Sequence, residues 1–149
     1  MTLRQFSRSL PMALMRAREA VMAEFRPILA AHDVTEQQWR VVRALVDEPD
    51  GLGIGELAER TCLLGPSLSR ILASLEARGL VSRSSVDHDG RRAVITATRA
   101  GLRLFETVSP LSESAYEQLE QRFGAAELDQ LHDLLDRLSS MARADEIRV

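Results

Sequence analysis

The segment of residues 54–98 constrains the fold more than any other part of the sequence. It opens with apolar residues at the i, i+3, i+4 spacing of one helix face, namely Ile54, Leu57 and Ala58. Pro66 then marks the first turn of a second helix, where its missing N–H costs nothing. The second helix has one apolar face, made by Leu68, Ile71, Leu72, Leu75 and Leu80. The spacing predicts two short amphipathic helices joined by a tight turn.

A two-stranded hairpin is predicted to follow the second helix. Gly79 is typical of a residue that ends a helix in the left-handed conformation. Residues 81–86 and 93–98 are predicted strands, and the sequence Asp-His-Asp-Gly at residues 87–90 is typical of the turn between them. Arg91 and Arg92 fall at or beside the tip. This order of elements predicts a winged helix-turn-helix in a mainly α protein. Over about forty residues it runs helix, turn, helix, strand, basic turn and strand.

The outward face of the second helix carries hydroxyl and guanidinium groups, which suit contacts with bases and phosphates in a major groove. A serine-rich helix face alone is usually solvated, and a basic hairpin alone is usually only a hairpin, but their order and spacing together favour DNA binding. The alternative is a winged helix that binds another protein, for which Arg70 and Arg91 would be dispensable. The predicted DNA-binding residues are Pro66, Ser67, Ser69, Arg70, Ser74, Arg91 and Arg92.

Three motifs resemble the pattern of the MarR family of bacterial transcriptional regulators. They are the L-x-x-L-x-x-x-G-L-V run of residues 72–81, the D-G-R-R turn of residues 89–92 and the T-x-x-G of residues 98–101. The similarity covers nearly the whole chain, and residues 17–45 and 62–72 resemble the subgroup of homoprotocatechuate-operon repressors. The resemblance implies a homodimeric repressor whose affinity for DNA is lowered by a hydroxylated aromatic acid. The chain departs from many members at Val86, where they carry an Asp, and at Gly65, where they carry a polar or basic residue.

Length and charge agree with this interpretation. The 149 residues are predicted to form one domain, with residues 35–98 as the DNA-binding lobe and residues 1–34 and 99–149 as dimerisation helices. The net charge is −3, but residues 60–92 hold six arginines against three acids, a balance of +3, and residues 105–149 hold ten acids against four arginines, a balance of −6. No signal peptide and no apolar run long enough to span a membrane are found, which predicts a soluble cytoplasmic protein.

The flanking segments have helical patterns. Residues 8–31, 99–123 and 125–142 are predicted helices, with Pro27 and Pro110 as expected bends. A leucine stripe in the last of them, Leu128, Leu131, Leu135 and Leu138, fits either an intrachain bundle or a contact between subunits. We expect the contact between subunits, because a two-fold dimer would place two recognition helices about one DNA turn apart.

A small-molecule site is predicted between the first two helices. Thr35 and Gln38 form a capping box that starts a helix at residue 36 and presents Trp39 on one face. Arg18 interrupts an apolar stripe in the preceding helix, so we expect it to pair either with an acid such as Glu19, Glu24 or a partner-chain carboxylate, or with the carboxylate of a ligand. The predicted ligand-binding residues are Arg16, Arg18, His32, Trp39 and Arg43.

Other chemistries are weakly supported. Cys62, the one cysteine, is expected to be buried filler, with a redox-sensing role as the alternative. His32, His88 and His132 are too scattered in the sequence to suggest a metal site. No nucleophile triad, phosphate loop or paired-carboxylate motif stands out, so we expect a protein without a cofactor that is not an enzyme.

Overall fold

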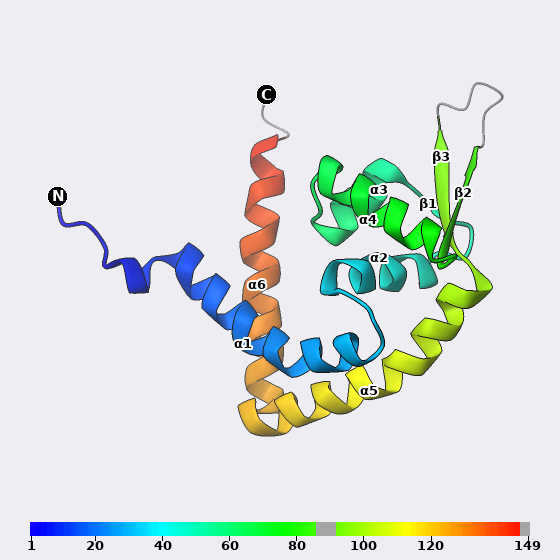
Figure 1. Cartoon of the computed structure of the whole chain (residues 1–149). Helices are drawn as coiled ribbons and strands as arrows, with labels where there is room; N and C mark the ends of the chain where they lie inside the picture. Colours follow the sequence, from blue (N-terminus) through cyan, green and yellow to red (C-terminus); the bar gives the residue numbers. More distant parts are fainter. Residues whose placement is uncertain (86–91, 147–149) are drawn as a thin grey trace. The chain divides into compact units, whose positions relative to one another are not determined.

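The computed structural model describes the backbone of residues 1–85 and 92–146, and side chains up to residue 141 within these ranges. The elements, in chain order, are η1 (Phe6–Arg8), α1 (Leu10–Ala31), α2 (Glu36–Val46), β1 (Leu52–Gly53), α3 (Ile54–Thr61), α4 (Gly65–Ala77), β2 (Val81–Ser85), β3 (Ala93–Ala97), α5 (Arg99–Phe123) and α6 (Ala125–Glu146) (Figure 1). The predicted mainly helical class is confirmed. The chain divides into two compact units, Met1–Ser112 and Glu113–Val149.

The core of the first unit lies among α2, α3, α4 and the sheet. The side chains of Leu57, Leu68, Leu72 and Leu75 from the two short helices have no exposed surface. They belong to one apolar cluster that also contains Val41, Val42, Leu45, Leu52 and Ile95. Burial of such a cluster supplies most of the driving force for folding, since each large aliphatic side chain contributes about 1.5–3 kcal/mol. The helix-turn-helix is thereby held against α2 and the sheet.

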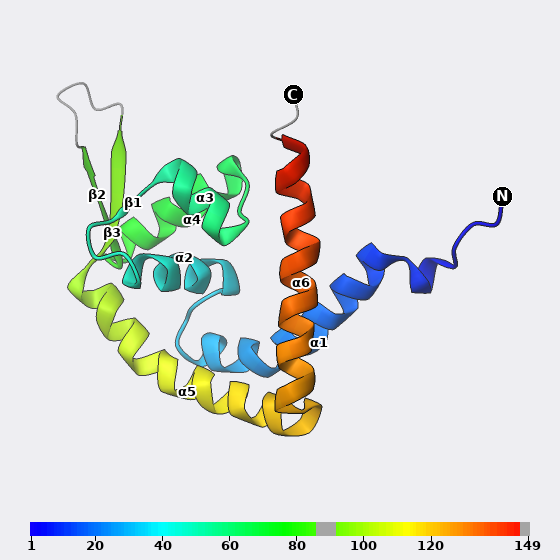
Figure 2. The same cartoon turned by 180° about the vertical axis from the view of Figure 1, so that it is seen from behind.

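The sheet is small and antiparallel, with strand order β1-β3-β2. Leu52 pairs with Ile95 on one side of β3, and Arg83 pairs with Ile95 on the other. β2 and β3 run side by side in both views (Figure 1, Figure 2). β1, which has only two residues, was not predicted from the sequence. The predicted hairpin turn at residues 87–90, together with Val86 and Arg91, lies outside the described residues.

Gly79 ends α4 as predicted. Its φ of +69° is left-handed, and two backbone hydrogen bonds close the helix end, from Gly79 N–H to the Glu76 carbonyl and from Leu80 N–H to the Leu75 carbonyl, both 2.9 Å. This pair of bonds is the Schellman motif, which directs the chain sharply out of the helix. Because Leu80 is buried, the end of α4 is also packed against the core.

The start of α5 is tied to this same corner. The Thr98 hydroxyl donates to the Gly79 carbonyl at 2.6 Å and accepts from Gly101 N–H at 3.1 Å, so Thr98 caps α5 and holds the end of α4. A Cβ on Gly101 would collide with the carbonyl oxygen of Leu80. The T-x-x-G motif therefore marks a close approach of two backbone segments, one just after α4 and one at the start of α5.

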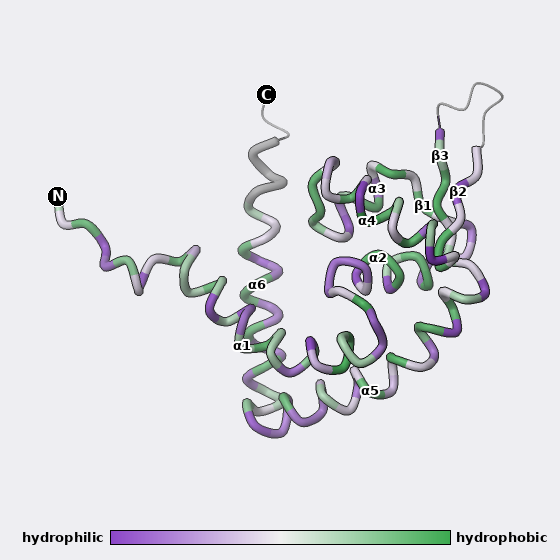
Figure 3. Tube along the Cα trace, viewed as in Figure 1, coloured by the Kyte–Doolittle hydropathy of each residue, from purple (hydrophilic) through white to green (hydrophobic). Residues whose placement is uncertain are grey.

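The long helices have one apolar and one polar face. Hydrophobic and hydrophilic positions alternate along α1 and α5 (Figure 3), and both helices continue past their prolines, Pro27 and Pro110. In the second unit, Gly124, with φ of +109°, turns the chain from α5 into α6. Tyr116 Oη lies 2.9 Å from His132 Nε2 and links the two helices of this unit. No helix in the described ranges is both long and apolar enough to cross a lipid bilayer.

Candidate DNA-binding surface and ligand cavity

The buried leucines of α4 fix which of its sides faces outward. Leu68, Leu72 and Leu75 are fully buried, whereas Arg70 and Ser74 are exposed one turn apart. Pro66 and Ser69 are exposed as well, and Ser67 is half-buried. The structure therefore brings the predicted α4 residues together on one outward surface.

A groove of about 410 Å³ runs between this face and the start of α2. It is lined by Thr35, Gln37, Gln38, Arg40, Leu63, Ser67, Arg70, Ile71 and Ser74. Gln38 is the main link across it, because its Nε2 donates to Ser74 Oγ at 3.0 Å and its Oε1 accepts from Arg78 Nη1 at 3.2 Å. The same Oε1 accepts from Thr35 N–H at 3.1 Å, which completes the predicted capping box. Ser74 thus has a structural contact in addition to its exposure.

The arginines around α4 differ in how they are paired. Arg83 Nε donates to Glu76 Oε1 at 3.0 Å, and Arg60 Nη1 donates to Glu48 Oε1 at 2.8 Å. For Arg70, no ion pair or hydrogen bond is present within residues 1–85 and 92–141, and its side chain is exposed. Arg92 is exposed, while Arg91 lies outside the described residues. Arg70 therefore has a charge available for a partner in solution.

A separate cavity of about 200 Å³ lies between α1 and α2. Its lining is Arg18, Met22, Phe25, Ile28 and Leu29 from α1, Glu36, Trp39 and Arg40 from α2, and Ser112 from α5. The walls are mostly apolar, and the charged groups are one carboxylate and two guanidinium groups. Such a cavity, apolar with a few polar groups, is the usual form of a small-molecule site.

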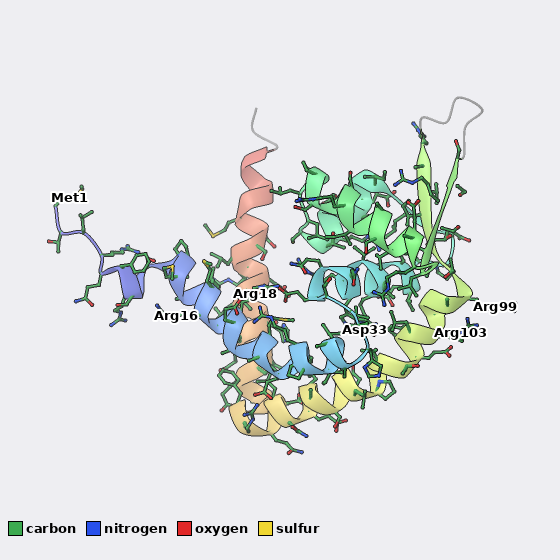
Figure 4. The ribbon with its side chains drawn as sticks, in the orientation of Figure 1. Met1, Arg16, Arg18, Asp33, Arg99 and Arg103 are labelled. Atoms are coloured by element: carbon green, nitrogen blue, oxygen red, sulfur yellow. The ribbon has the colours of Figure 1, made fainter. Side chains whose placement is uncertain are left out.

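Arg18 is paired inside this cavity. It projects from α1 (Figure 4), and its Nη1 and Nη2 lie 3.4 and 3.1 Å from the two carboxylate oxygens of Glu36. It also lies 3.8 Å from Glu19, one of the acids predicted from the sequence, whereas Glu36 was not predicted. A hydrogen bond from Arg26 lowers the pKa of Glu19, which keeps this neighbouring carboxylate ionised.

Trp39 lines the cavity as predicted and also contacts α5. Its ring stacks on Phe105, with centroids 5.9 Å apart and planes 14° apart. Arg43 lies over the same Phe105, with its Cζ 5.4 Å from the ring centroid, and pairs with Asp47 at 3.9 Å. Arg43 therefore contacts Phe105 and Asp47 and is not part of the cavity lining.

The two remaining predicted ligand residues also lie away from the lining. Arg16 donates to the carbonyl of Ser7, and His32 Nδ1 lies 2.9 Å from the carbonyl of Ile28. The structure thus brings Arg18 and Trp39 together but not Arg16, His32 or Arg43. Glu36 and Arg40 were missed, although their spacing from Trp39 places all three on one helical face.

Arg40 extends from the cavity toward the helix-turn-helix. Its Nη1 donates to the carbonyl of Thr61, the last residue of α3, at 2.7 Å. Its Nε is buried and has no hydrogen-bond partner among the residues that the structure describes.

The expectation that Cys62 is buried was wrong. Cys62 is exposed, and it caps α3 in the left-handed conformation with φ of 55°. Because the backbone reverses there, the thiol does not continue the apolar stripe of α3. Within the described part of the chain, no three His, Cys, Asp or Glu side chains are grouped to hold a metal ion.

Comparison with known proteins agrees with this architecture. Residues 32–92 match the model of the MarR family. The homoprotocatechuate degradative operon repressor of Escherichia coli is 41% identical over 136 residues, which cover 91% of each chain. The crystal structure of NadR in complex with 4-hydroxyphenylacetate is 37% identical with a TM-score of 0.77, covering 93% of this chain and 97% of that one. The repressor CouR, bound to a 23-mer DNA duplex, is 25% identical with a TM-score of 0.80, covering 93% and 99%.

These relatives are transcriptional regulators rather than enzymes, and proteins of their family are dimers. The TM-scores of 0.77 and 0.80 show that the two solved structures share the fold described above. The chain belongs to the MarR family of DNA-binding transcriptional regulators.

Proposed function

We propose that this regulator is a homodimeric repressor that leaves its operator when an aromatic carboxylic acid enters the cavity between α1 and α2. The observation that carries the proposal is the lining of that cavity. Phe25 and Trp39 offer ring and apolar contacts, and Arg18 and Arg40 offer positive charge to a carboxylate. A volume of about 200 Å³ suits a single ring with a short acidic side chain. The complex of NadR with 4-hydroxyphenylacetate supports this class of ligand.

The DNA-binding residues in this proposal are those of the outward face of α4 and of the wing. Arg70 is the base-reading residue, because its guanidinium is exposed and can bond bidentately to guanine. Arg91 and Arg92 contribute phosphate or minor-groove contacts from the wing. The remaining contacts are proposed for Pro66, Ser67, Ser69 and Ser74.

The dimer in this proposal is built by residues 1–34 and 99–149, around a DNA-binding lobe of residues 35–98. Both flanking regions carry large hydrophobic side chains that the single chain leaves exposed, and such patches mark interaction surfaces. In α1 they include Leu10, Leu14, Met15 and Val21, and in the second unit Phe123, Leu131, Leu134 and Met141. A second copy of the chain would cover these side chains and would pair two recognition helices.

A ligand can release the operator only if it binds the DNA-incompetent state of the dimer more tightly than the competent one. The cavity is suited to this role because α2 forms part of its wall and also contacts α4 through Gln38. A ring placed against Trp39 would therefore act on the helix that supports the recognition helix.

Surface plasmon resonance on an operator selected from random duplexes tests the proposal. We expect a panel of hydroxyphenylacetates, benzoates and cinnamates to include acids that release the wild-type protein. Arg91→Ala should lower the salt slope of operator binding by about one unit, and Arg70→Ala should also relax base preference, with a loss of about 1–3 kcal/mol. Unchanged operator affinity in both variants would remove the DNA-reading assignment and favour a protein-binding winged helix. Failure of every acid in the panel would remove the effector class.

A further inference from the structure

Arg40 connects two features that are otherwise separate. Its side chain lines the cavity between α1 and α2, and it also lines the groove beside α4. Its Nη1 holds the carbonyl of Thr61 at 2.7 Å, and Thr61 is itself buried at the end of α3. Only Cys62, Leu63 and Leu64 separate Thr61 from the first residue of α4. Arg40 is therefore in contact with the turn that sets the position of the recognition helix.

The Nε edge of the same guanidinium lacks a hydrogen-bond acceptor. Its Nε is buried, and among the described residues nothing accepts its hydrogen bond. Buried donors on charged groups are almost always satisfied, because leaving one without an acceptor is costly. A small rotation of the side chain would turn this nitrogen toward the adjoining cavity, where an acidic group could accept its hydrogen bond.

Arg18, the other guanidinium in the cavity, is in the opposite situation. Both of its terminal nitrogens already face the carboxylate of Glu36, at 3.4 and 3.1 Å. A ligand carboxylate at Arg18 would have to displace this carboxylate and leave Glu36, whose side chain is only 15% exposed, with the more distant Arg26, at 3.7 Å, as its remaining partner. A ligand carboxylate at Arg40 would compete with no acceptor at Nε and, once the side chain rotates, would satisfy this nitrogen.

We propose that Arg40 transmits ligand binding in the cavity to the helix-turn-helix. The acidic group of the effector binds at Nε, while Nη1 stays hydrogen-bonded to the carbonyl of Thr61. The proposal rests on the function proposed above. A guanidinium group is planar and rigid, so a carboxylate that draws Nε into the cavity moves Nη1 with it. The carbonyl of Thr61 moves with Nη1. Because the turn from Thr61 to α4 is short, α4, the recognition helix, is displaced as well.

The first test compares a charged ligand with its neutral isostere. Calorimetry with the full-length protein would measure the affinities of 4-hydroxyphenylacetate and 4-hydroxyphenylacetamide. The wild type should prefer the acid about ten- to a hundredfold, as expected for a charge-assisted hydrogen bond. Arg40→Met should bring this preference close to one, and the matched control Arg26→Met, at an arginine of α1 outside the cavity lining, should keep it. Arg18→Met, on the opposite wall, tests the competing anchor. Arg40→Lys, which keeps the charge but has no Nε edge, provides the same test if the methionine variant fails to fold.

The outcomes separate this inference from the proposed function. A wild type that binds the acid no better than the amide would overturn the aromatic-acid effector and the role of Arg40 with it. A wild type that prefers the acid, with the preference intact in Arg40→Met and Arg40→Lys, would overturn the role of Arg40 alone. Loss of the preference in Arg18→Met but not in the Arg40 variants would assign the anchor to Arg18 instead.

The second test asks whether Arg40 transmits binding as well as anchoring the ligand. Hydrogen exchange of the amides of residues 61–65 would be followed with and without saturating 4-hydroxyphenylacetate. The wild type should change its protection in this turn, and Arg40→Lys, saturated at a higher ligand concentration, should not. Equal changes in the two proteins would show that the signal reaches α4 by another route and would overturn the proposal.

Discussion

At the scale of a single residue, Cys62 combines an exposed thiol with a left-handed backbone that L-residues rarely adopt. The left-handed conformation places Cβ close to the following carbonyl, a strain that glycine does not have. Cys62→Gly should therefore raise the free energy of unfolding by about 0.5–1 kcal/mol. Urea denaturation measures the change. Asp33→Gly, at another residue with φ of 55°, is the matched control and should gain less, because Asp tolerates this conformation better.

The same variant decides whether Cys62 senses oxidants. If operator release depends on the cavity, peroxide should leave operator binding of the wild type and of Cys62→Gly equally intact, and an aromatic acid should release both. Release of the wild type by peroxide, abolished in Cys62→Gly, would establish the redox alternative. The exposure of the thiol makes the experiment informative, since an exposed cysteine is within reach of the oxidant.

At the scale of elements, α2 contacts both the cavity and the recognition helix, and Gln38 is its main polar link to α4. Gln38→Leu removes its hydrogen bonds with Thr35, Ser74 and Arg78 and should lower stability by about 1–3 kcal/mol. Operator affinity should fall as well, because α4 loses a constraint on its position. Thermal unfolding and plasmon resonance would measure the two effects.

Thr35→Ala is the control for this prediction. It removes the capping box and should cost about 1 kcal/mol of stability, but it leaves the bonds from Gln38 to α4 in place. Operator affinity should therefore stay near the wild-type value. An equal loss of operator affinity in Thr35→Ala and Gln38→Leu would mean that stability alone, and not the link to α4, governs DNA binding.

The contrast between these elements and the cavity shows what could be predicted from sequence. The capping box of Thr35 and Gln38 and the helix end at Gly79 were predicted because each depends on residues a few positions apart. The pairs Arg18 with Glu36 and Arg40 with Thr61 join residues 18 and 21 positions apart, and no local pattern indicates them. The left-handed cap at Cys62 was missed for a related reason, since cysteine is not typical of that conformation.

At the scale of the whole molecule, the exposed leucines of α6 are part of the proposed contact with a second copy of the chain. Leu131 and Leu134 are 39% and 56% exposed, one turn apart on this helix. Replacing both by Asp should cost several kcal/mol of dimer stability, because the carboxylates would be buried without partners. Light scattering should then report monomer or unfolded chain. Asp at Ser140, which is nine residues from Leu131 and therefore on the opposite side of α6, is the control and should leave the dimer intact. A dimer of wild-type stability in the leucine variant would show that the interface lies elsewhere.

Trp39 is the one tryptophan of the chain, and it lies in the wall of the cavity, stacked on Phe105. The ultraviolet emission of the protein therefore originates almost entirely at the place where an effector would bind. A ring that slides against the indole, or separates it from Phe105, should shift or quench this emission, and no dye or label is needed to record it. Tryptophan fluorescence can therefore be used to rank the affinities of candidate acids in solution.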